Sequence, residues 1–239
     1  EYTKNETLLK AEGISLFIDG NPILRDVNVE IKNIVRKELT QGQIVGFLGP
    51  SGVGKTQFSE ILTGLKTPGV HVESNYEVRG KITISTPAVE ISAGMVGFVQ
   101  QNYPLFEYMT VYKNLKVAAS KSDYEKKDQM DRIKFYLDKL NLTAHANKYP
   151  AQLSGGQKQR VAIIQQLLCS KHFLVLDEPL SGLDPNSLGK VCEMLQSVAS
   201  MDDLNTIIII SHVIEATIGI ADTLWIMGKE RDSNGNFIP

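Results

Sequence analysis

Apolar and polar positions follow two different periods along this chain, and each period predicts its own kind of element. Residues 8–20 and 22–31 alternate like two strands on either side of a turn, so we expect an antiparallel hairpin near the N-terminus. Short apolar runs predict further strands at 43–49, 80–85, 95–100, 173–177, 206–211 and 223–227. Helical segments separate the last three of these runs. Because apolar strands that alternate with helices are typical of a parallel sheet covered on both faces, the expected fold class is α/β.

Between residues 110 and 152 the pattern becomes polar and helical. The segment 122–142 is the clearest amphipathic helix of the chain. Its charged positions predict a solvated face, and its apolar positions are expected to form the core of a small helical lobe. These apolar positions are Met130, Ile133, Phe135, Leu137 and Leu140. The sequence therefore predicts a helical insertion near the middle of the chain.

Composition and charge narrow the function. The chain has 239 residues, of which 42% are hydrophobic and 22% charged, as is ordinary for a globular protein. Its formal net charge of −2 argues against a protein that binds nucleic acid through a broad basic surface. The N-terminal residues lack the pattern of a secretory signal, and no apolar run is long enough to cross a bilayer. Any role at a membrane is therefore expected to depend on another chain.

A glycine-rich loop ends the apolar run at 43–49. The sequence GPSGVGKT fits the pattern G-x-x-x-x-G-K-[ST] and lies between a predicted strand and a predicted helix, as a phosphate-binding loop (P-loop) does. Glycines let the backbone wrap closely around phosphates, and the N-terminus of the following helix adds partial positive charge. We expect Lys55 to reach the β- and γ-phosphates and Thr56 to ligate Mg²⁺. The expected nucleotide-binding residues of this loop are Gly49, Pro50, Ser51, Gly52, Val53, Gly54, Lys55, Thr56 and Gln57.

A second polar loop, LSGGQ at 153–157, precedes a long helical run. A serine and two glycines at a helix N-terminus form another surface that can bind an anion. The simpler alternative is that Ser154 only caps the helix. The match over five consecutive residues favours the anion-binding interpretation.

With these two loops, the chain resembles the nucleotide-binding subunits of ATP-binding cassette (ABC) transporters over residues 8–227. The resemblance implies a single ABC ATPase domain over residues 1–239, with a P-loop NTPase core, a mixed and mainly parallel sheet, an N-terminal antiparallel β subdomain and a helical subdomain. The core and the β subdomain would occupy 1–104 and 161–239, and the helical subdomain about 105–160. The implied activity is Mg²⁺-dependent hydrolysis of ATP, so ATP and Mg²⁺ are the expected cofactors.

The apolar run at 173–177 ends in two carboxylates, Asp177 and Glu178. A buried strand that ends in this way places both groups at the edge of the sheet where ligands bind. By resemblance to the family, Asp177 would hold Mg²⁺ and Glu178 would be the general base for the attacking water. His212, which follows the run at 206–211, resembles the switch histidine that contacts the γ-phosphate and this water.

Three further positions are carried over from the family. Asp184 in the sequence SGLD matches the D-loop. Gln101 is the expected Q-loop glutamine near Mg²⁺, with its neighbour Gln100 as the alternative. For the aromatic residue that stacks on adenine, Ile18 falls at the expected position and Phe17 lies one residue away. Because neighbouring strand residues point to opposite faces, Phe17 can take this role only if the hairpin carries a bulge; otherwise adenine would be held by aliphatic contact.

The resemblance also implies a head-to-tail dimer. Each ATP would lie between the P-loop of one copy and the signature residues of the other, which are Ser154, Gly155, Gly156 and Gln157. Integral membrane subunits, and a substrate-binding protein in an importer, would be the remaining partners, with no nucleic acid among them. The expected location is the cytoplasmic face of the cell membrane, and import is the expected direction. The alternative is a soluble non-transport ABC ATPase that acts on nucleic acid or ribosomes.

Overall fold

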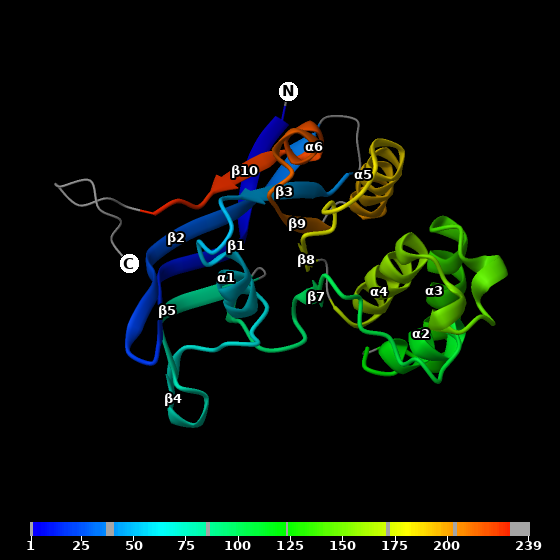
Figure 1. Cartoon of the computed structure of the whole chain (residues 1–239), viewed down its shortest axis with the longest axis horizontal. Helices are drawn as coiled ribbons and strands as arrows, with labels where there is room; N and C mark the ends of the chain where they lie inside the picture. The colour runs from blue at the N-terminus through cyan, green and yellow to red at the C-terminus, as the bar shows by residue number, and fades with distance from the viewer. Residues whose placement is uncertain are drawn as a thin grey trace.

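The computed structural model describes residues 2–36, 41–84, 87–122, 124–170, 173–202 and 205–229 (Figure 1). Its strands form two sheets. The antiparallel sheet has the order β2-β1-β5-β4, with β6 also paired to β5. The second sheet has the order β10-β3-β9-β8-β7, and its strands are parallel. This arrangement is the expected α/β fold with an antiparallel β layer.

The elements have the following bounds. The strands are β1 (Tyr2–Ile18), β2 (Asn21–Arg36), β3 (Gln43–Leu48), β4 (Gly69–His71), β5 (Tyr76–Ile84), β6 (Val89–Glu90), β7 (Gly97–Val99), β8 (Phe173–Asp177), β9 (Thr206–Ser211) and β10 (Thr223–Ile226). The α-helices are α1 (Lys55–Leu62), α2 (Val111–Ala119), α3 (Lys126–Lys139), α4 (Gly155–Cys169), α5 (Pro185–Ala199) and α6 (Ile214–Ile220). Short 3₁₀ helices span η1 (Val72–Ser74), η2 (Thr143–His145) and η3 (Pro150–Gln152).

Strands β1 and β2 form the predicted hairpin. Its turn consists of Asp19 and Gly20, with φ angles of 49° and 75°. Two consecutive residues with positive φ give a two-residue turn the twist of the strands that it joins. The pairing of β1 with β2 is interrupted by register shifts, one of them between Leu16 and Phe17. The extra residue at this shift is Ile23 of β2, whereas Ser15 to Ile18 of β1 pair with β5 without a break, so the side chains of Phe17 and Ile18 keep the regular alternation of a strand.

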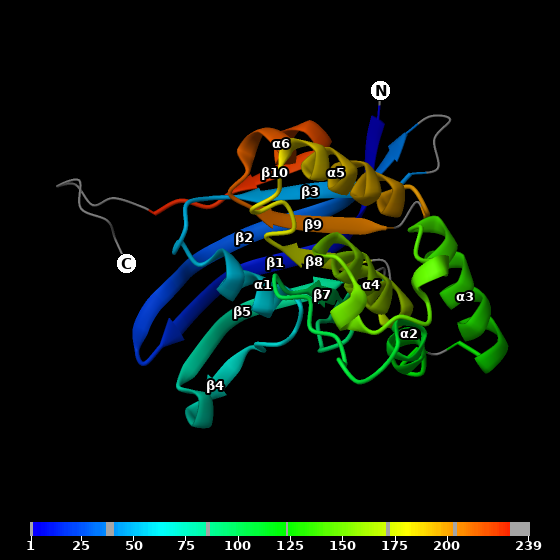
Figure 2. The same cartoon turned by 45° about the vertical axis from the view of Figure 1, so that its right-hand side comes forward.

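The two faces of the parallel sheet pack against different layers. On β9, Ile207 and Ile209 belong to a core shared with α2, α3, α4 and α5. The alternate residues Ile208 and Ile210 belong to a second core, shared with α1 and the antiparallel sheet. Successive side chains of a strand point to opposite faces of the sheet, and both faces of this sheet are covered, so both sets are buried. Figure 2 shows the parallel strands side by side, in the order β10, β3, β9, β8 and β7.

Helices α2, α3 and α4 gather on one side of the molecule, away from the antiparallel sheet (Figure 1). Helix α4 contacts α2 and α3 and also β7 of the parallel sheet. The boundary expected near residue 160 between the helical subdomain and the core therefore lies within a continuous helix. None of the helices in the described ranges is long and apolar enough to span a bilayer.

The expectation for the apolar positions of α3 was partly wrong. Ile133, Leu137 and Leu140 are buried as expected, but Met130 and Phe135 are each 46% exposed. Phe135 lies two residues from both Ile133 and Leu137, about 200° around the helix from each of them, so it faces away from the packed side. The packed stripe begins only at Ile133, which leaves Met130 outside it.

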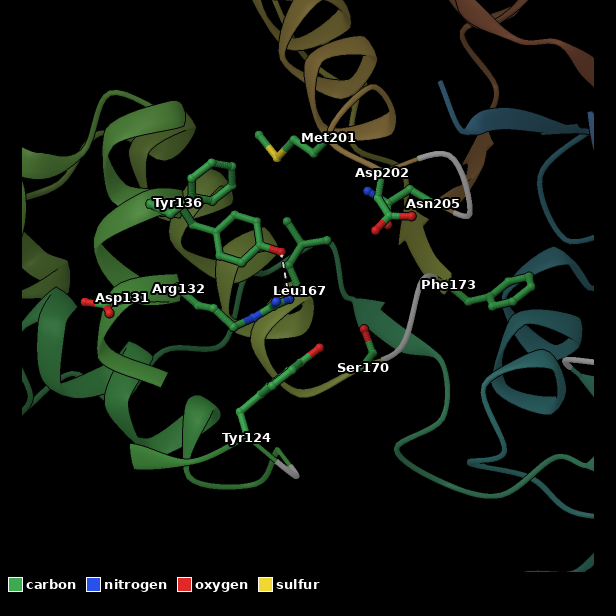
Figure 3. A pocket seen from close by; sticks show the side chains of 11 residues that line it. Tyr124, Asp131, Arg132, Tyr136, Leu167, Ser170, Phe173, Met201, Asp202 and Asn205 are labelled. Atoms are coloured by element: carbon green, nitrogen blue, oxygen red, sulfur yellow. Dashed lines mark hydrogen bonds between the residues drawn. The ribbon is translucent and has the colours of Figure 1, made fainter. Parts of the chain in front are cut away.

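A cavity of about 420 Å³ separates α3 from the parallel sheet (Figure 3). The guanidinium carbon of Arg132 lies 4.2 Å from the centre of the Tyr124 ring, and one of its nitrogens donates to the Tyr136 hydroxyl over 3.3 Å. Burial raises the pKa of Tyr136. On the other side the cavity is lined by Phe173 and Asn205, which lie at the N-terminal ends of β8 and β9. The residues that resemble a nucleotide site are at the opposite, C-terminal ends of these strands.

Candidate nucleotide-binding and catalytic site

The P-loop connects β3 to α1, as the sequence predicted. Gly52 and Gly54 have φ angles of 74° and 101°, which side chains other than glycine rarely allow. A Cβ atom at Gly49 would lie only 2.6 Å from the backbone oxygen of Met227. The N-cap residue of α1 is Gly54, which has no side chain that could accept from the first backbone N–H groups of the helix. These donors can therefore bind phosphate oxygens.

The ammonium group of Lys55 lies within the P-loop. The residue is 7% exposed, and its Nζ donates to the backbone oxygens of Gly49 and Pro50 over 2.7 and 3.0 Å. These contacts hold a positive charge on the inner side of the loop. Phosphate oxygens would be stronger acceptors for the same protons, because their negative charge adds an attraction that the neutral backbone oxygens lack.

Thr56 and Asp177 meet at the edge of the parallel sheet. The Thr56 hydroxyl donates to Oδ2 of Asp177 over 3.3 Å. Burial raises the pKa of Asp177; the hydrogen bond from Thr56 acts in the opposite direction, and the neighbouring Glu178 adds to the rise. A hydroxyl and a carboxylate are oxygen ligands of the kind that Mg²⁺ prefers, so this pair fits the cation.

Both candidate Q-loop glutamines lie beside this pair. A cavity of about 540 Å³ is lined by Thr56, Glu60, Phe98, Gln100, Gln101, Asn102 and Asp177. Gln101 therefore lies near the candidate Mg²⁺ ligands, as the sequence suggested, and Gln100 does so as well. The cavity alone does not distinguish the two residues.

Glu178 and His212 form a second pair at the same edge. Nδ1 of His212 lies 2.9 Å from Oε2 of Glu178, and the backbone N–H of His212 donates to the same oxygen over 3.4 Å. The backbone N–H of Glu178 donates to Ile210 over 2.9 Å, which fixes the end of β8 against β9. Glu178 has a φ angle of 53°, an uncommon and strained conformation for a residue with a side chain. Backbone strain of this kind often occurs at functional sites.

The signature loop has the geometry of a helix N-terminus that can accept an anion. Ser154 caps α4: its hydroxyl accepts from the backbone N–H of Gln157 over 3.3 Å, and the Gln157 side chain accepts from the backbone N–H of Ser154 over 2.9 Å. The space around Gly155 and Gly156 is open, since a Cβ atom at either position would contact no atom within 4 Å. Ser154 therefore is a helix cap, and the loop beside it leaves room for a ligand.

Asp184 caps α5. Its carboxylate accepts from the backbone N–H groups of Asn186 and Ser187 over 3.1 and 3.2 Å and from the Ser187 hydroxyl over 2.5 Å. The hydrogen bond from Ser187 holds the pKa of Asp184 below its usual value. The residue thus has a structural task in this chain, and its expected place at the interface of a dimer stays a prediction.

Phe17, the candidate residue for stacking on adenine, is not among the residues that line the cavity beside the P-loop. Its volume is about 310 Å³, and it is lined by Pro22, Ile23, Leu24, Arg25, Val27, Gly52, Val53, Met227, Gly228 and Lys229. The ring of Phe17 lies instead under the guanidinium group of Arg79, at 4.7 Å. Ile23 is an exposed aliphatic residue that lines this cavity, and the sequence analysis did not identify it as a candidate contact for the base. Its position directly after the predicted turn at 19–22 gave no signal.

Asn114 is a second residue that the sequence analysis missed. Its buried side chain accepts from the backbone N–H of Phe106 and donates to the backbone oxygens of Phe106, Met109 and Thr110 over 2.9 to 3.1 Å. It thereby holds the loop that follows the Q-loop glutamines. A polar residue next to Leu115 and three after Val111, on the buried side of a helix, was the available signal.

Fold and site together define a P-loop nucleotide-binding protein of the α/β class. The chain belongs to the ABC transporter family, since residues 33–181 match the family model described as "ABC transporter". The glutamate transport ATP-binding protein GluA of Corynebacterium efficiens is 33% identical, over 80% of this chain and 76% of that protein. The methionine import ATP-binding protein MetN of Clostridium acetobutylicum is 32% identical over 90% of this chain. The chain spans 64% of the length of MetN.

A solved structure agrees with this assignment. The structure of cbiO1 from Clostridium perfringens, described as part of the ABC transporter complex cbiONQ, has a TM-score of 0.76 and 26% sequence identity. The match covers 93% of this chain and 85% of the cbiO1 chain. The expected fold is thus confirmed, and ATP is the nucleotide for which the relatives are named.

Proposed function

We propose that this chain is the Mg²⁺-dependent ATPase subunit of an ABC importer. The observation that carries the proposal is the convergence of two pairs, Thr56 with Asp177 and Glu178 with His212, at the C-terminal edge of one parallel sheet. The P-loop ends at the same edge. Ligands of open α/β sheets bind beyond the carboxyl ends of the strands, so a triphosphate on the P-loop would lie against both pairs.

Each group has a task in the proposed hydrolysis. Lys55 and the N–H groups at the start of α1 would bind the phosphates, while Thr56, Asp177 and Gln101 would hold Mg²⁺. When bound, Mg²⁺ would neutralise charge on the phosphate oxygens. Glu178 would orient the attacking water and accept its proton. His212 would donate from its ring to the γ-phosphate side of the site and keep the carboxylate of Glu178 in place.

The signature residues support a dimer of two copies. In the described residues, no hydrogen bond or ion pair joins the loop at 153–157 to the P-loop of the same chain. Open space at Gly155 and Gly156 leaves the N-terminus of α4 free to approach an anion. A second copy that supplies its P-loop and ATP would complete the site, with Asp184 at the contact between the copies. A two-fold contact of this kind closes on itself.

An exposed aromatic patch supports a membrane partner. Tyr108 is 74% exposed, and its ring centre lies 6.1 Å from that of Phe106, which is also exposed. Clusters of exposed aromatic side chains are typical of protein interfaces. The patch lies in the segment that connects the Q-loop to α2, so a membrane subunit bound there could follow movements of the nucleotide site. The chain would then lie at the cytoplasmic face of the membrane.

The names of the relatives support import. Two of them are named as import proteins, for methionine and for sulfate or thiosulfate, and a third is named as a glutamate transport protein. Because these substrates have little chemistry in common, we assign the choice of substrate to the membrane subunits and a substrate-binding protein.

The Glu178→Gln variant tests the ATPase and the dimer. Without the carboxylate, ATP should stay bound and turnover should fall at least about 100-fold. Size exclusion with light scattering should then show a dimer with MgATP and a monomer with MgADP. A Glu125→Gln variant, at an exposed position outside the site, is the matched control. An ATP-bound monomer would contradict the dimer, and full turnover in Glu178→Gln would contradict the assigned base.

Purification from membranes tests the partner. The tagged chain should be recovered with an integral membrane protein, and the double variant Phe106→Ser/Tyr108→Ser should lose it while retaining ATPase activity. Recovery with ribosomes or DNA and with no membrane protein would favour the soluble alternative and contradict the importer.

A further inference from the structure

A buried glutamine connects the signature helix to the end of β8. Gln159 lies on α4, two residues after the last signature residue, and is 2% exposed. Its side-chain amide donates to the backbone oxygen of Pro179 over 3.0 Å. Pro179 directly follows Glu178. The hydrogen bond therefore joins two segments that the proposed mechanism uses for different tasks.

The segment around Glu178 needs external support. Its φ angle of 53° is strained for a residue with a side chain, and such a conformation persists only where the surroundings enforce it. Two supports come from the parallel sheet, through the backbone oxygen of Ile210 and the side chain of His212. The bond from Gln159 to Pro179 is a support from the opposite direction, through the helical layer.

Glutamine suits this position for a physical reason. A buried backbone oxygen without a partner is unfavourable, and a side chain from another element can supply the missing N–H. The donor comes from a helix whose first turn, five residues earlier, begins at the cap Ser154. A rigid helix transmits a displacement of its first turn to its second turn, so the position of the signature loop affects the position of the Pro179 oxygen.

We propose that Gln159 is a positioning residue for Glu178 and that it couples the signature loop to the catalytic carboxylate of the same chain. The inference rests on the proposed ATPase function. An ATP held by the signature loop of one subunit would, through Gln159, keep that subunit's own Glu178 in line with its own ATP. Hydrolysis at one site thereby depends on nucleotide at the other.

Two substitutions at Gln159 test this proposal. Gln159→Met preserves length and burial but has no donor, and Gln159→Glu preserves shape while facing the Pro179 oxygen with a carboxylate. In both variants we expect kcat to fall roughly 10- to 100-fold, as for a misplaced catalytic group, with KM for ATP changed less than about twofold. The dependence of rate on ATP concentration should also lose cooperativity. The matched control is Gln165→Met, since Gln165 is a buried glutamine of the same helix whose amide contacts Asn114 instead of the Glu178 segment.

The outcomes separate the inference from the function on which it rests. If the wild-type chain does not hydrolyse ATP, the proposed function fails and this inference fails with it. If the wild type is active and both Gln159 variants retain its kcat, only the inference is overturned. It is also overturned if Gln165→Met shows the same loss of kcat, or if both Gln159 variants fail to fold while Gln165→Met folds, because Gln159 then has a structural role only.

Discussion

The hydroxyl of Thr56 lies 3.3 Å from Oδ2 of Asp177, although 121 positions separate the two residues in the chain. The contact joins the first turn of α1 to the last residue of β8. It brings two oxygen groups from distant segments to one point, which is what a Mg²⁺ site needs.

Replacing Asp177 should therefore weaken the apparent affinity of the protein for Mg²⁺. In Asp177→Asn, we expect the Mg²⁺ concentration that gives half-maximal ATPase activity to rise about 10- to 100-fold, because the amide removes a negative charge from the metal's surroundings. A Mg²⁺ titration at saturating ATP measures this shift. Asp138→Asn, on the exposed side of α3, is the control. An unchanged Mg²⁺ requirement in Asp177→Asn would remove the residue from the metal site.

His212 should affect the rate more than the binding of ATP. Its ring contacts Glu178 over 2.9 Å, so His212→Ala removes both a donor near the γ-phosphate and a support for the carboxylate. We expect kcat to fall about 100-fold. Steady-state kinetics and binding of a fluorescent ATP analogue measure the two quantities separately. His71→Ala, at a histidine stacked on Tyr76 outside the site, should retain wild-type kcat; equal losses in both variants would argue against a role in the reaction.

Ile23 should matter more than Phe17 for binding the base. Ile23 lines the cavity beside Gly52 and Val53, whereas the Phe17 ring is covered by Arg79. Loss of the aliphatic contact in Ile23→Ser should cost about 1 kcal/mol, or roughly fivefold in Kd for ATP. Phe17→Leu should change Kd by less than about twofold. Isothermal titration measures both, and the reverse order would restore Phe17 as the residue that stacks on adenine.

Asn114 should be a determinant of stability. Asn114→Leu leaves the N–H of Phe106 and three backbone oxygens without their side-chain partner in a partly buried setting, so we expect the free energy of unfolding to fall by about 2 kcal/mol. Urea unfolding followed by circular dichroism measures the change. Asn33→Ala is the control, since Asn33 makes an exposed side-chain bond to Glu6 and should change stability by less than about 0.5 kcal/mol. Similar losses in the two variants would show that the Asn114 network adds nothing.

The sequence predicted the site because its residues stand at the ends of regular elements. A strand of known direction places its last residue at a known edge, so the P-loop after β3, the carboxylates after β8 and His212 after β9 could be assigned to one edge of the sheet from their order alone. The hairpin was equally clear, because its turn residues Asp19 and Gly20 tolerate positive φ.

Contacts between side chains and distant backbone atoms could not be predicted from the sequence. Gln159 and Asn114 lie on buried helix faces, but the oxygens that they contact are fixed only by how the helices pack. The burial of Phe135 was wrongly predicted for a related reason. Apolar character predicts burial only when a neighbouring element covers that side of the helix, and no element of the described ranges covers Phe135 enough to bury it.

The left-handed backbone conformation of Glu178 means that the stability of this turn and the proposed role of the side chain call for different residues. Glycine would adopt that conformation without strain, so Glu178→Gly could make β8 and the following turn easier to form. It would also delete the only atoms at this position that can accept a proton from water. A more stable backbone and the proposed general base would thus favour different residues at this one position.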